Sequence, residues 1–136
     1  MIHMYTGKDD LPEPVRWTVH GSRPIYDNRW VSLALVDVEP AGGARYEHHI
    51  VSIPYEAVSV VVHHRDRGVL LLYRHRFITD TAGFEIPAGG IEQGESVADA
   101  AAREVMEETG WSVTRPEVFM TANASDGVSD QRFHFA

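Results

Sequence analysis

The chain of 136 residues contains no cysteine. Disulfide bonds and thiolate metal sites are therefore excluded, and any bound metal must be held by oxygen or imidazole ligands. No stretch approaches the roughly 20 apolar residues that a membrane-spanning helix needs, and the N-terminus lacks the basic start and apolar run of a secretion signal. We expect a soluble protein without a secretion signal, and the absence of cysteine fits a cytoplasmic location.

Basic residues are scarce as well. Twelve Lys and Arg face 20 Asp and Glu, which gives a net charge of −8. Surfaces that follow a phosphate backbone need clustered Lys and Arg, so we expect no general attraction to nucleic acid or to an anionic membrane. Only Lys8 is a lysine. Arginine favours forked contacts with carboxylate or phosphate, although genome composition explains the same bias.

Acidic residues, in contrast, gather between residues 85 and 108. Seven acids and one base, Arg103, give this segment a local charge of −6. Carboxylates crowded in this way repel one another unless a cation or solvent separates them. The seven acids are Glu85, Glu92, Glu95, Asp99, Glu104, Glu107 and Glu108.

A change in composition at Pro54 divides the chain into two parts. Before it, apolar and β-branched runs separated by turn residues predict a small antiparallel sheet. After it, short apolar runs are typical of strands buried on both faces. We expect an N-terminal β unit over 1–53 and a sheet-and-helix domain over 54–136, which together make an α/β (α+β) chain. The expected strands of the first part are 17–20, 30–38 and 44–53, with turns at 21–24 and 27–28.

A helix is predicted over residues 97–109. Ser96 followed by Asp99 resembles a capping box at its start, and Gly110 stands where a left-handed C-terminal cap would be. A glycine-rich loop over 87–94 is expected before it. At 100° per residue, one helix face is expected to pack and the opposite face to present carboxylates. The packing face has Ala98, Ala102 and Val105, with Ala101 and Met106 at its edges, and the acidic face has Glu104, Glu107 and Glu108.

These three glutamates are spaced for metal binding. Glu104 and Glu108 are one helical turn apart and Glu107 is three residues from Glu104, so the three carboxylates can converge on one point. Carboxylates bind hard cations such as Mg²⁺ or Mn²⁺, commonly together with substrate phosphates. Arg103 can hold the carboxylate of Glu107, four residues away. Taken alone, the same residues also fit a solvated charged face.

The full spacing resembles a known motif. Gly89, Glu95, the run Arg103–Val105, the pair Glu107–Glu108 and the pair Gly110–Trp111 stand at the positions of the Nudix box, G-x5-E-x7-R-E-U-x-E-E-x-G-U, where U is a bulky apolar residue. The chain is therefore identified as a member of the Nudix hydrolase family. The resemblance implies an α/β/α sandwich with a mixed sheet, preceded here by the small N-terminal sheet.

Segments before the box resemble the ADP-ribose pyrophosphatase branch of that family. Residues 71–77 (LLYRHRF) are similar to the strand that precedes the box, and residues 84–89 (FEIPAG) to the segment that leads into it. The branch has an N-terminal sheet that is often exchanged between two subunits, so the resemblance implies a homodimer. Residues 127–130 and 132–136 look like the branch's downstream loop and strand, although Asp126 replaces the usual proline.

The resemblance also implies a reaction and its residues. The reaction would be Mg²⁺- or Mn²⁺-dependent hydrolysis of a nucleoside diphosphate linked to another moiety, first of all ADP-ribose to AMP and ribose 5-phosphate. A dinucleotide or a nucleoside triphosphate would keep the chemistry and change the pocket. Carried over by position, the metal ligands would be Glu104, Glu108, Glu107 and the carbonyl of Ala88, with Glu107, Glu108 and Arg103 as the catalytic set and Gly89, Glu95 and Arg103 as supports.

Substrate contacts would come from Arg76 and from aromatic residues. Arg76 would pair with a phosphate, for which its forked guanidinium is suited, and a surface arginine at a strand end is the alternative. Trp17, Trp30 or Tyr46 would stack on the base, or pack as core residues of the small sheet. In each of the histidine pairs 48–49 and 63–64, the two side chains point to opposite faces of a strand and cannot chelate one metal well. We therefore expect these histidines to be structural or solvated.

One part of the branch's pattern is missing. Its general base is a glutamate well beyond the strand that ends near Ala136, so we expect this chain to be a fragment or a truncated member of the branch. Asp126 and Asp130 are the substitutes within the chain. The rival hypothesis is a non-catalytic Nudix module that binds a nucleotide and acts in sensing or partner binding.

Overall fold

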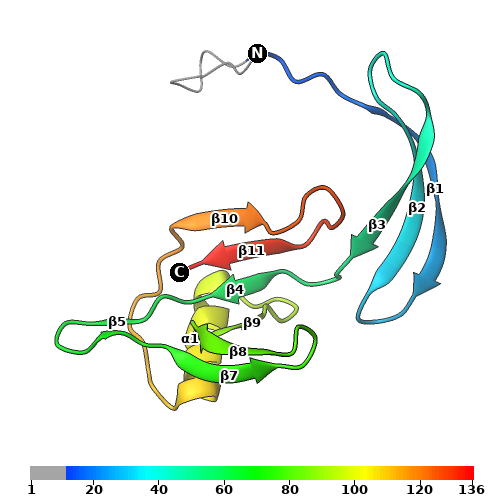
Figure 1. Ribbon diagram of the computed structural model, residues 1–136. Coiled ribbons are helices and arrows are strands. Elements are labelled where there is room, and N and C mark those ends of the chain that lie inside the picture. Colours follow the sequence, from blue (N-terminus) through cyan, green and yellow to red (C-terminus); the bar gives the residue numbers. More distant parts are fainter. Residues whose placement is uncertain (1–11) are drawn as a thin grey trace.

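The N-terminal part folds as a three-stranded antiparallel sheet. The computed structural model describes residues 12–136, so the first eleven residues of the expected β unit lie outside the described part. The strand order is β1-β2-β3, with β2 in the middle. Figure 1 shows this sheet standing apart from the rest of the chain. Its strands are β1 (Thr18–Asp27), β2 (Ser32–Glu39) and β3 (Tyr46–Ser52).

The turn expected at residues 21–24 is wrong, because β1 continues through it. Its pairing with β2 shifts register between Val19 and Gly21 and again between Pro24 and Tyr26. Such irregularities accommodate glycine and proline within a strand. Proline has no N–H group to donate, and an edge strand tolerates this loss because one of its sides is unpaired. The turn expected at residues 27–28 begins at Asn28, because Asp27 is still the last residue of β1. Asn28 Oδ1 accepts hydrogen bonds from the Trp30 and Val31 amides at 2.7 and 2.9 Å.

The second part is built on a four-stranded mixed sheet of order β10-β11-β4-β9. β4 pairs in parallel with β11, and the two outer pairs are antiparallel. The glycine-rich loop expected over 87–94 is wrong at its start, because β9 pairs with β4 there. The strands are β4 (Ala57–Ser59), β9 (Ala88–Gly90), β10 (Met120–Asn123) and β11 (Arg132–Phe135).

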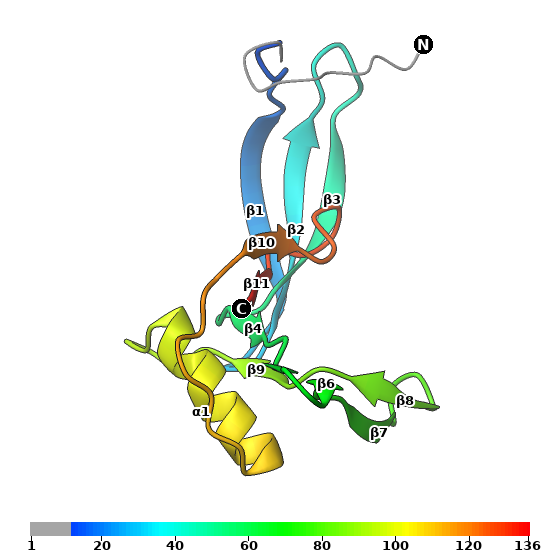
Figure 2. The same ribbon diagram turned by 90° about the vertical axis from the view of Figure 1, so that its left-hand side faces the viewer.

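Two hairpins connect β4 to β9. The first pairs β5 (His63–His64) with β6 (Gly68–Val69), and the second pairs β7 (Leu72–Arg76) with β8 (Thr81–Glu85). In the second hairpin Leu72 pairs with Glu85, the last residue of β8. β9 begins three residues later, at Ala88. Figure 2 shows the three-stranded sheet rising away from α1, β9 and the β7–β8 hairpin.

The helix α1 (Val97–Thr109) has the predicted bounds and caps. Ser96 Oγ accepts a hydrogen bond from the Asp99 amide at 3.1 Å, and Gly110 adopts the left-handed conformation with φ of 73°. The mixed sheet and the helix confirm the expected α/β (α+β) class. Within residues 12–136 α1 is the single helix, so the described part contains one helical layer against the sheet. No helix in that part is long and apolar enough to cross a membrane.

The packing face of α1 is only partly the expected one, since Val105 is buried as predicted but Ala98 and Ala102 are only part-buried. Ala100, Ala101 and Val105 are fully buried and pack with Val58 of β4, whereas Met106 is 44% exposed. Glu104 and Glu108 are part-buried next to this face instead of opposite to it. Because β9 is made of alanine and glycine, it leaves room for glutamate side chains between the helix and the sheet edge. Glu104 and Glu108 therefore lie between the helix and the sheet edge.

The loop before β11 forms hydrogen bonds that connect the three-stranded sheet to the four-stranded sheet. The Val51 amide donates to the carbonyl of Val128 at 2.8 Å, and Ser52 Oγ donates to Asp130 Oδ2 at 2.7 Å. His48 Nε2 lies 2.8 Å from the carbonyl of Gly127. The C-terminal end of β3 is therefore the end that is fixed to the second part of the chain.

Candidate active site

Glu104 lies directly over Gly89. A Cβ atom added to Gly89 would meet the Glu104 Cδ and Oε1 atoms at 2.1 Å, which is far inside contact distance. Only glycine leaves this space empty, so the first position of the motif is a steric requirement of the acid that follows fifteen residues later. The strand and the helix thus determine together where the Glu104 carboxylate lies.

Glu108 lies one helical turn further along and reaches the residue before Gly89. Its Oε2 accepts a hydrogen bond from the Ala88 amide at 3.2 Å, and its Oε1 accepts one from Arg74 Nη1 at 2.8 Å. Glu104 and Glu108 are therefore held at neighbouring residues of β9. Their side chains are only 12% and 18% exposed, so two carboxylates are partly withdrawn from water at one edge of the sheet.

Arg103 joins the helix to the loop before it. Its Nε and Nη2 atoms both lie 2.9 Å from the Glu95 carboxylate, and Nη2 also donates to the Gly90 carbonyl at 2.8 Å. Nη1 donates to Glu104 Oε1 at 2.7 Å. The hydrogen bonds from Arg103, together with the Glu92 amide, lower the pKa of Glu95 to about 2. The pKa of Arg103 is raised by the same bonds to Glu95 and Glu104, so this pair stays ionised at neutral pH.

Glu107 does not join the other two glutamates. Its side chain is 58% exposed, and its contact with Arg103 Nη1 is 3.3 Å long. In the described part of the chain no three acidic or imidazole side chains gather as a group that could hold a metal. The expected convergence of three carboxylates is thus not seen, because arginines pair with Glu104 and Glu108 while Glu107 points outward from the same helix.

The β7–β8 hairpin brings two arginines to this edge. Arg76 is paired with Glu85 through Nε–Oε1 and Nη2–Oε2 distances of 2.9 and 2.5 Å. The hydrogen bond with Arg76 lowers the pKa of Glu85 and raises that of Arg76. Arg74 bonds to Glu108 and lies 3.8 Å from Glu85. The sequence reasoning missed Arg74, although the alternation of a strand places it on the same face as Arg76.

The donor set fits a divalent cation in its chemistry. The two part-buried carboxylates supply hard oxygen ligands, and the chain has no thiol to favour a softer metal. Both carboxylates stand at one strand edge, and the arginines now bonded to them already neutralise charge there. A cation bound there would likewise neutralise the negative charge of the two carboxylates.

The three aromatic candidates fall at two ends of the N-terminal sheet. Trp17 and Tyr46 lie edge to face with ring centroids 6.3 Å apart, at the end of β3 that is not fixed to the second part. Six residues of strand, about 20 Å at ~3.4 Å per residue, separate Tyr46 from the fixed end. Trp30 lies at the β1–β2 turn with the Arg29 guanidinium 4.6 Å from its ring centroid. The structure therefore does not bring the three together.

Asp130 and Asp126, the substitutes for the general base, lie in the loop before β11. Asp130 accepts hydrogen bonds from Ser52 Oγ and from the Ile53 amide, the latter at 3.4 Å. These bonds place it at the start of β4, whereas Ala88 of the glutamate site pairs with Ser59 at the end of that strand. Asp126 is exposed in the turn between β10 and β11. The structure assigns Asp130 to the junction of the two sheets.

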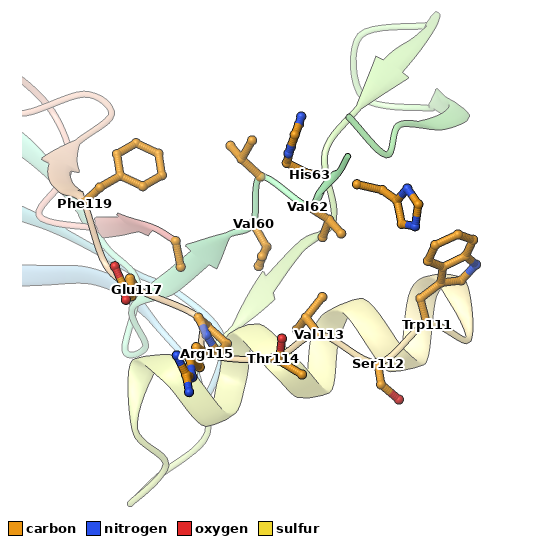
Figure 3. A pocket seen from close by; sticks show the side chains of 14 residues that line it. Val60, Val62, His63, Trp111, Ser112, Val113, Thr114, Arg115, Glu117 and Phe119 are labelled. Carbon is orange, nitrogen blue, oxygen red and sulfur yellow. The ribbon is translucent and has the colours of Figure 1, made fainter. Parts of the chain in front are cut away.

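Two hollows lie near α1 without containing the glutamate pair. A cavity of about 570 Å³ at the C-terminal end of the helix is lined by Val60, Val62, Trp111, Val113 and Phe119 among others (Figure 3). A cleft of about 600 Å³ adjoins Glu95 and includes Arg29 of the β1–β2 turn in its lining.

Comparison with known proteins identifies the second part of the chain. A family model described as NUDIX domain matches residues 54–135. A solved structure described as an ADP compounds hydrolase superposes with a TM-score of 0.80 at 21% sequence identity, over 91% of this chain and 68% of that chain. At this level of identity the superposition shows a shared fold.

Three curated relatives have longer chains. A CMP-5'-(N-acetyl-N-hydroxy-3-aminopropyl)phosphonate hydrolase from Streptomyces rubellomurinus is 38% identical over 88% of this chain and 58% of its own. A methanol dehydrogenase activator from Bacillus methanolicus is 32% identical, and an ADP-ribose pyrophosphatase from Bacillus subtilis is 29% identical, each over 81% of this chain and 59% of its own. The chain thus spans less than two thirds of the length of these relatives.

Proposed function

This chain belongs to the Nudix family, and from that premise we propose that it takes part in metal-dependent hydrolysis of a nucleotide linked to another group through its phosphates. The observation that carries the proposal is the Glu104–Glu108 pair, held at neighbouring residues of β9 next to two arginines. Carboxylates that bind a divalent cation and arginines that bind phosphate are the two kinds of group that such a reaction requires.

The proposed roles combine the contacts with the positions of the Nudix motif. Glu104 and Glu108 would hold Mg²⁺ or Mn²⁺ from where they stand. Glu107 and the Ala88 carbonyl are proposed as further ligands from their motif positions, and the exposed Glu107 side chain would have to turn inward. A bound cation would draw electron density from the diphosphate and orient the attacking water. Arg103 and Glu95 hold Glu104 in place through their mutual hydrogen bonds, and Gly89 leaves the space that the carboxylate occupies.

Arg76 is proposed as the phosphate ligand from the hairpin. Its guanidinium is turned toward Glu85, so binding a substrate phosphate would require Arg76 to share or exchange that partner. Charge-assisted forked contacts to phosphate are strong enough to compete with the Glu85 carboxylate for Arg76, whose side chain is about half exposed.

The experiment is hydrolysis of a substrate panel with Mg²⁺ or Mn²⁺, followed by chromatographic detection of the released nucleoside monophosphate. ADP-ribose is the first member, and a CMP-linked phosphonate is the second because of the similar Streptomyces hydrolase. Glu108→Gln removes one charge of the pair with little change in size, so we expect a loss of about 10²-fold or more in kcat/KM. Glu117→Gln, in the connection after α1, is the matched control and should match the parent. An unaltered rate in Glu108→Gln would refute the assignment.

A non-catalytic role is the second candidate function, favoured by one specific similarity. The relative from Bacillus methanolicus is described as an activator of another enzyme. If the chain binds a nucleotide to act on a partner, calorimetry should detect metal-dependent nucleotide binding while the panel gives no product. Hydrolysis that depends on Glu108 would exclude this alternative.

We also propose a homodimer formed through the N-terminal sheet. All ten residues of β1 are exposed, and Val19, Ile25 and Tyr26 are 64%, 48% and 56% exposed. A sheet that projects from the molecule with this much apolar surface is typical of an interaction site. Trp17 and Tyr46 would then approach a partner's site instead of their own. Light scattering after gel filtration tests this, and a monomer at micromolar concentration would refute it.

A further inference from the structure

Among residues 12–136, Arg74 has one partner within hydrogen-bond distance, Glu108, which is one of the two glutamates of the site. Its Nη1 atom lies 2.8 Å from Glu108 Oε1, and its Nε atom lies 3.8 Å from Glu85 Oε2. The nearer contact joins β7 to α1 across 34 residues of sequence. Arg74 therefore links the hairpin to the helix through the carboxylate that is proposed to bind the metal.

Both oxygens of Glu108 are used in this arrangement. Oε2 accepts the hydrogen bond from the Ala88 amide, and Oε1 accepts the one from Arg74. The amide is neutral and part of β9, so that bond can persist when a cation binds. The guanidinium places a full positive charge at Oε1, one of the two oxygens that Glu108 could offer to a divalent cation. Two cations within about 4 Å repel each other strongly in a partly buried site, so Arg74 and a metal compete for Glu108.

The two neighbouring arginines are held differently. Arg103 forms bonds to Glu95, Glu104, Glu107 and the Gly90 carbonyl, so it would keep its position if one partner were lost. Arg76 occupies both oxygens of Glu85. Glu85 is thus already paired, and it offers Arg74 only the longer contact. Of these three guanidiniums, Arg74 is the one whose short contact is confined to a proposed metal ligand.

We propose that Arg74 has two successive partners, Glu108 in the metal-free protein and a substrate phosphate when a divalent cation occupies Glu108 in its place. This inference rests on the proposed function. The side chain is 30% exposed and shares the hairpin face with Arg76, so it needs to turn only locally to reach an anion beside the site. A guanidinium is suited to either partner because both present two oxygens in its plane.

Two opposite effects on binding follow. Arg74 weakens metal binding by competing for Glu108, and it strengthens nucleotide binding only when the metal has released it. Metal and nucleotide must then increase each other's affinity, and this coupling is reciprocal. A residue that merely supports Glu108 would have the reverse effect on the metal, because its loss would let the carboxylate move and weaken metal binding.

The test measures binding by calorimetry, with Mn²⁺ alone and with the non-hydrolysable probe α,β-methylene-ADP in the absence and presence of Mn²⁺. Arg74→Gln should bind Mn²⁺ alone about three- to tenfold more tightly than the parent, as expected for loss of one competing, partly buried ion pair. The increase in α,β-methylene-ADP affinity caused by Mn²⁺ should fall by about tenfold. Arg23→Gln, which removes a similar Arg–Glu pair with a 2.9 Å contact in the N-terminal sheet, should match the parent in both.

A second variant keeps the inference testable if Arg74→Gln is unstable. Arg74→Lys retains the charge, so Mn²⁺ affinity should stay within about twofold of the parent while the nucleotide coupling weakens, because an ammonium lacks the forked geometry. Weaker or unchanged Mn²⁺ binding in Arg74→Gln, with a normal Arg23→Gln, would overturn the inference and leave the proposed function standing. Absence of Mn²⁺ binding by the parent protein would overturn both.

Discussion

The contact between Gly89 and Glu104 offers the sharpest test of the site. In Gly89→Ala the new Cβ atom would stand 2.1 Å from the Glu104 carboxylate, whereas ordinary contacts begin near 3.4 Å. The carboxylate must therefore move away by more than 1 Å, and its 2.7 Å bond to Arg103 must lengthen or break. Misplacement of a catalytic group by about 1 Å costs on the order of 10²-fold in rate, so kcat/KM should fall by that factor.

The same substitution should have little effect on folding. The colliding atoms belong to the end of a flexible side chain that reaches the solvent edge, so we expect about 1 kcal/mol of destabilisation, at the low end for overpacking. For a domain of this size that lowers Tm by roughly 3–5 °C. Gly127→Ala is the control, because a Cβ atom added there meets nothing within 4 Å.

The assays are hydrolysis of the best substrate in the panel and thermal denaturation followed by circular dichroism. Activity of Gly89→Ala within threefold of the parent would refute the reasoning, since Glu104 would then have no need of its observed position. An equal loss of activity in Gly127→Ala would also refute it, because the effect would not depend on the contact with Glu104.

Three further predictions concern the surroundings of the site. The pKa of Glu95 is lowered to about 2 by its bonds to Arg103 and to the Glu92 amide. The contribution of Glu95 to stability is therefore present above about pH 4.5 and is lost as the pH falls through 2. The Tm difference between the parent and Glu95→Gln, measured from pH 6 to pH 2, should shrink in that interval. Ser96→Ala removes the side-chain cap of α1 and should cost about 1 kcal/mol in urea unfolding, and a cost near zero would contradict the capping geometry. Asp130→Ala should loosen the junction at Ser52, seen as faster hydrogen exchange of the Val51 amide, without the 10²-fold loss of hydrolysis that a general base would show.

The sequence predicted the helix most accurately because the signals for its ends are local. A cap depends on residues three apart and a left-handed residue depends on glycine, so the bounds at residues 97 and 109 need no tertiary information. The strand β1 was predicted less well, because glycine and proline favour turns in isolation and only pairing with β2 makes them irregularities of an edge strand. The sequence at the start of β9 favours a loop for the same reason, since alanine and glycine have weak strand preference and only pairing with β4 makes them a strand.

For the candidate site, the sequence by itself determined the residue types, their spacing and the family. Spacing along the chain establishes which groups recur on one side of a helix, and that was enough to name Glu104, Glu107 and Glu108 and to relate Arg103 to Glu95. Only the tertiary structure decided which of them lie together. It placed Glu104 and Glu108 against β9 and left Glu107 exposed, because the neighbouring strand offers space over Gly89 and an amide at Ala88. It also placed Arg74 next to Glu108. That contact depends on how the hairpin packs against the helix, so the spacing of residues along the chain does not predict it.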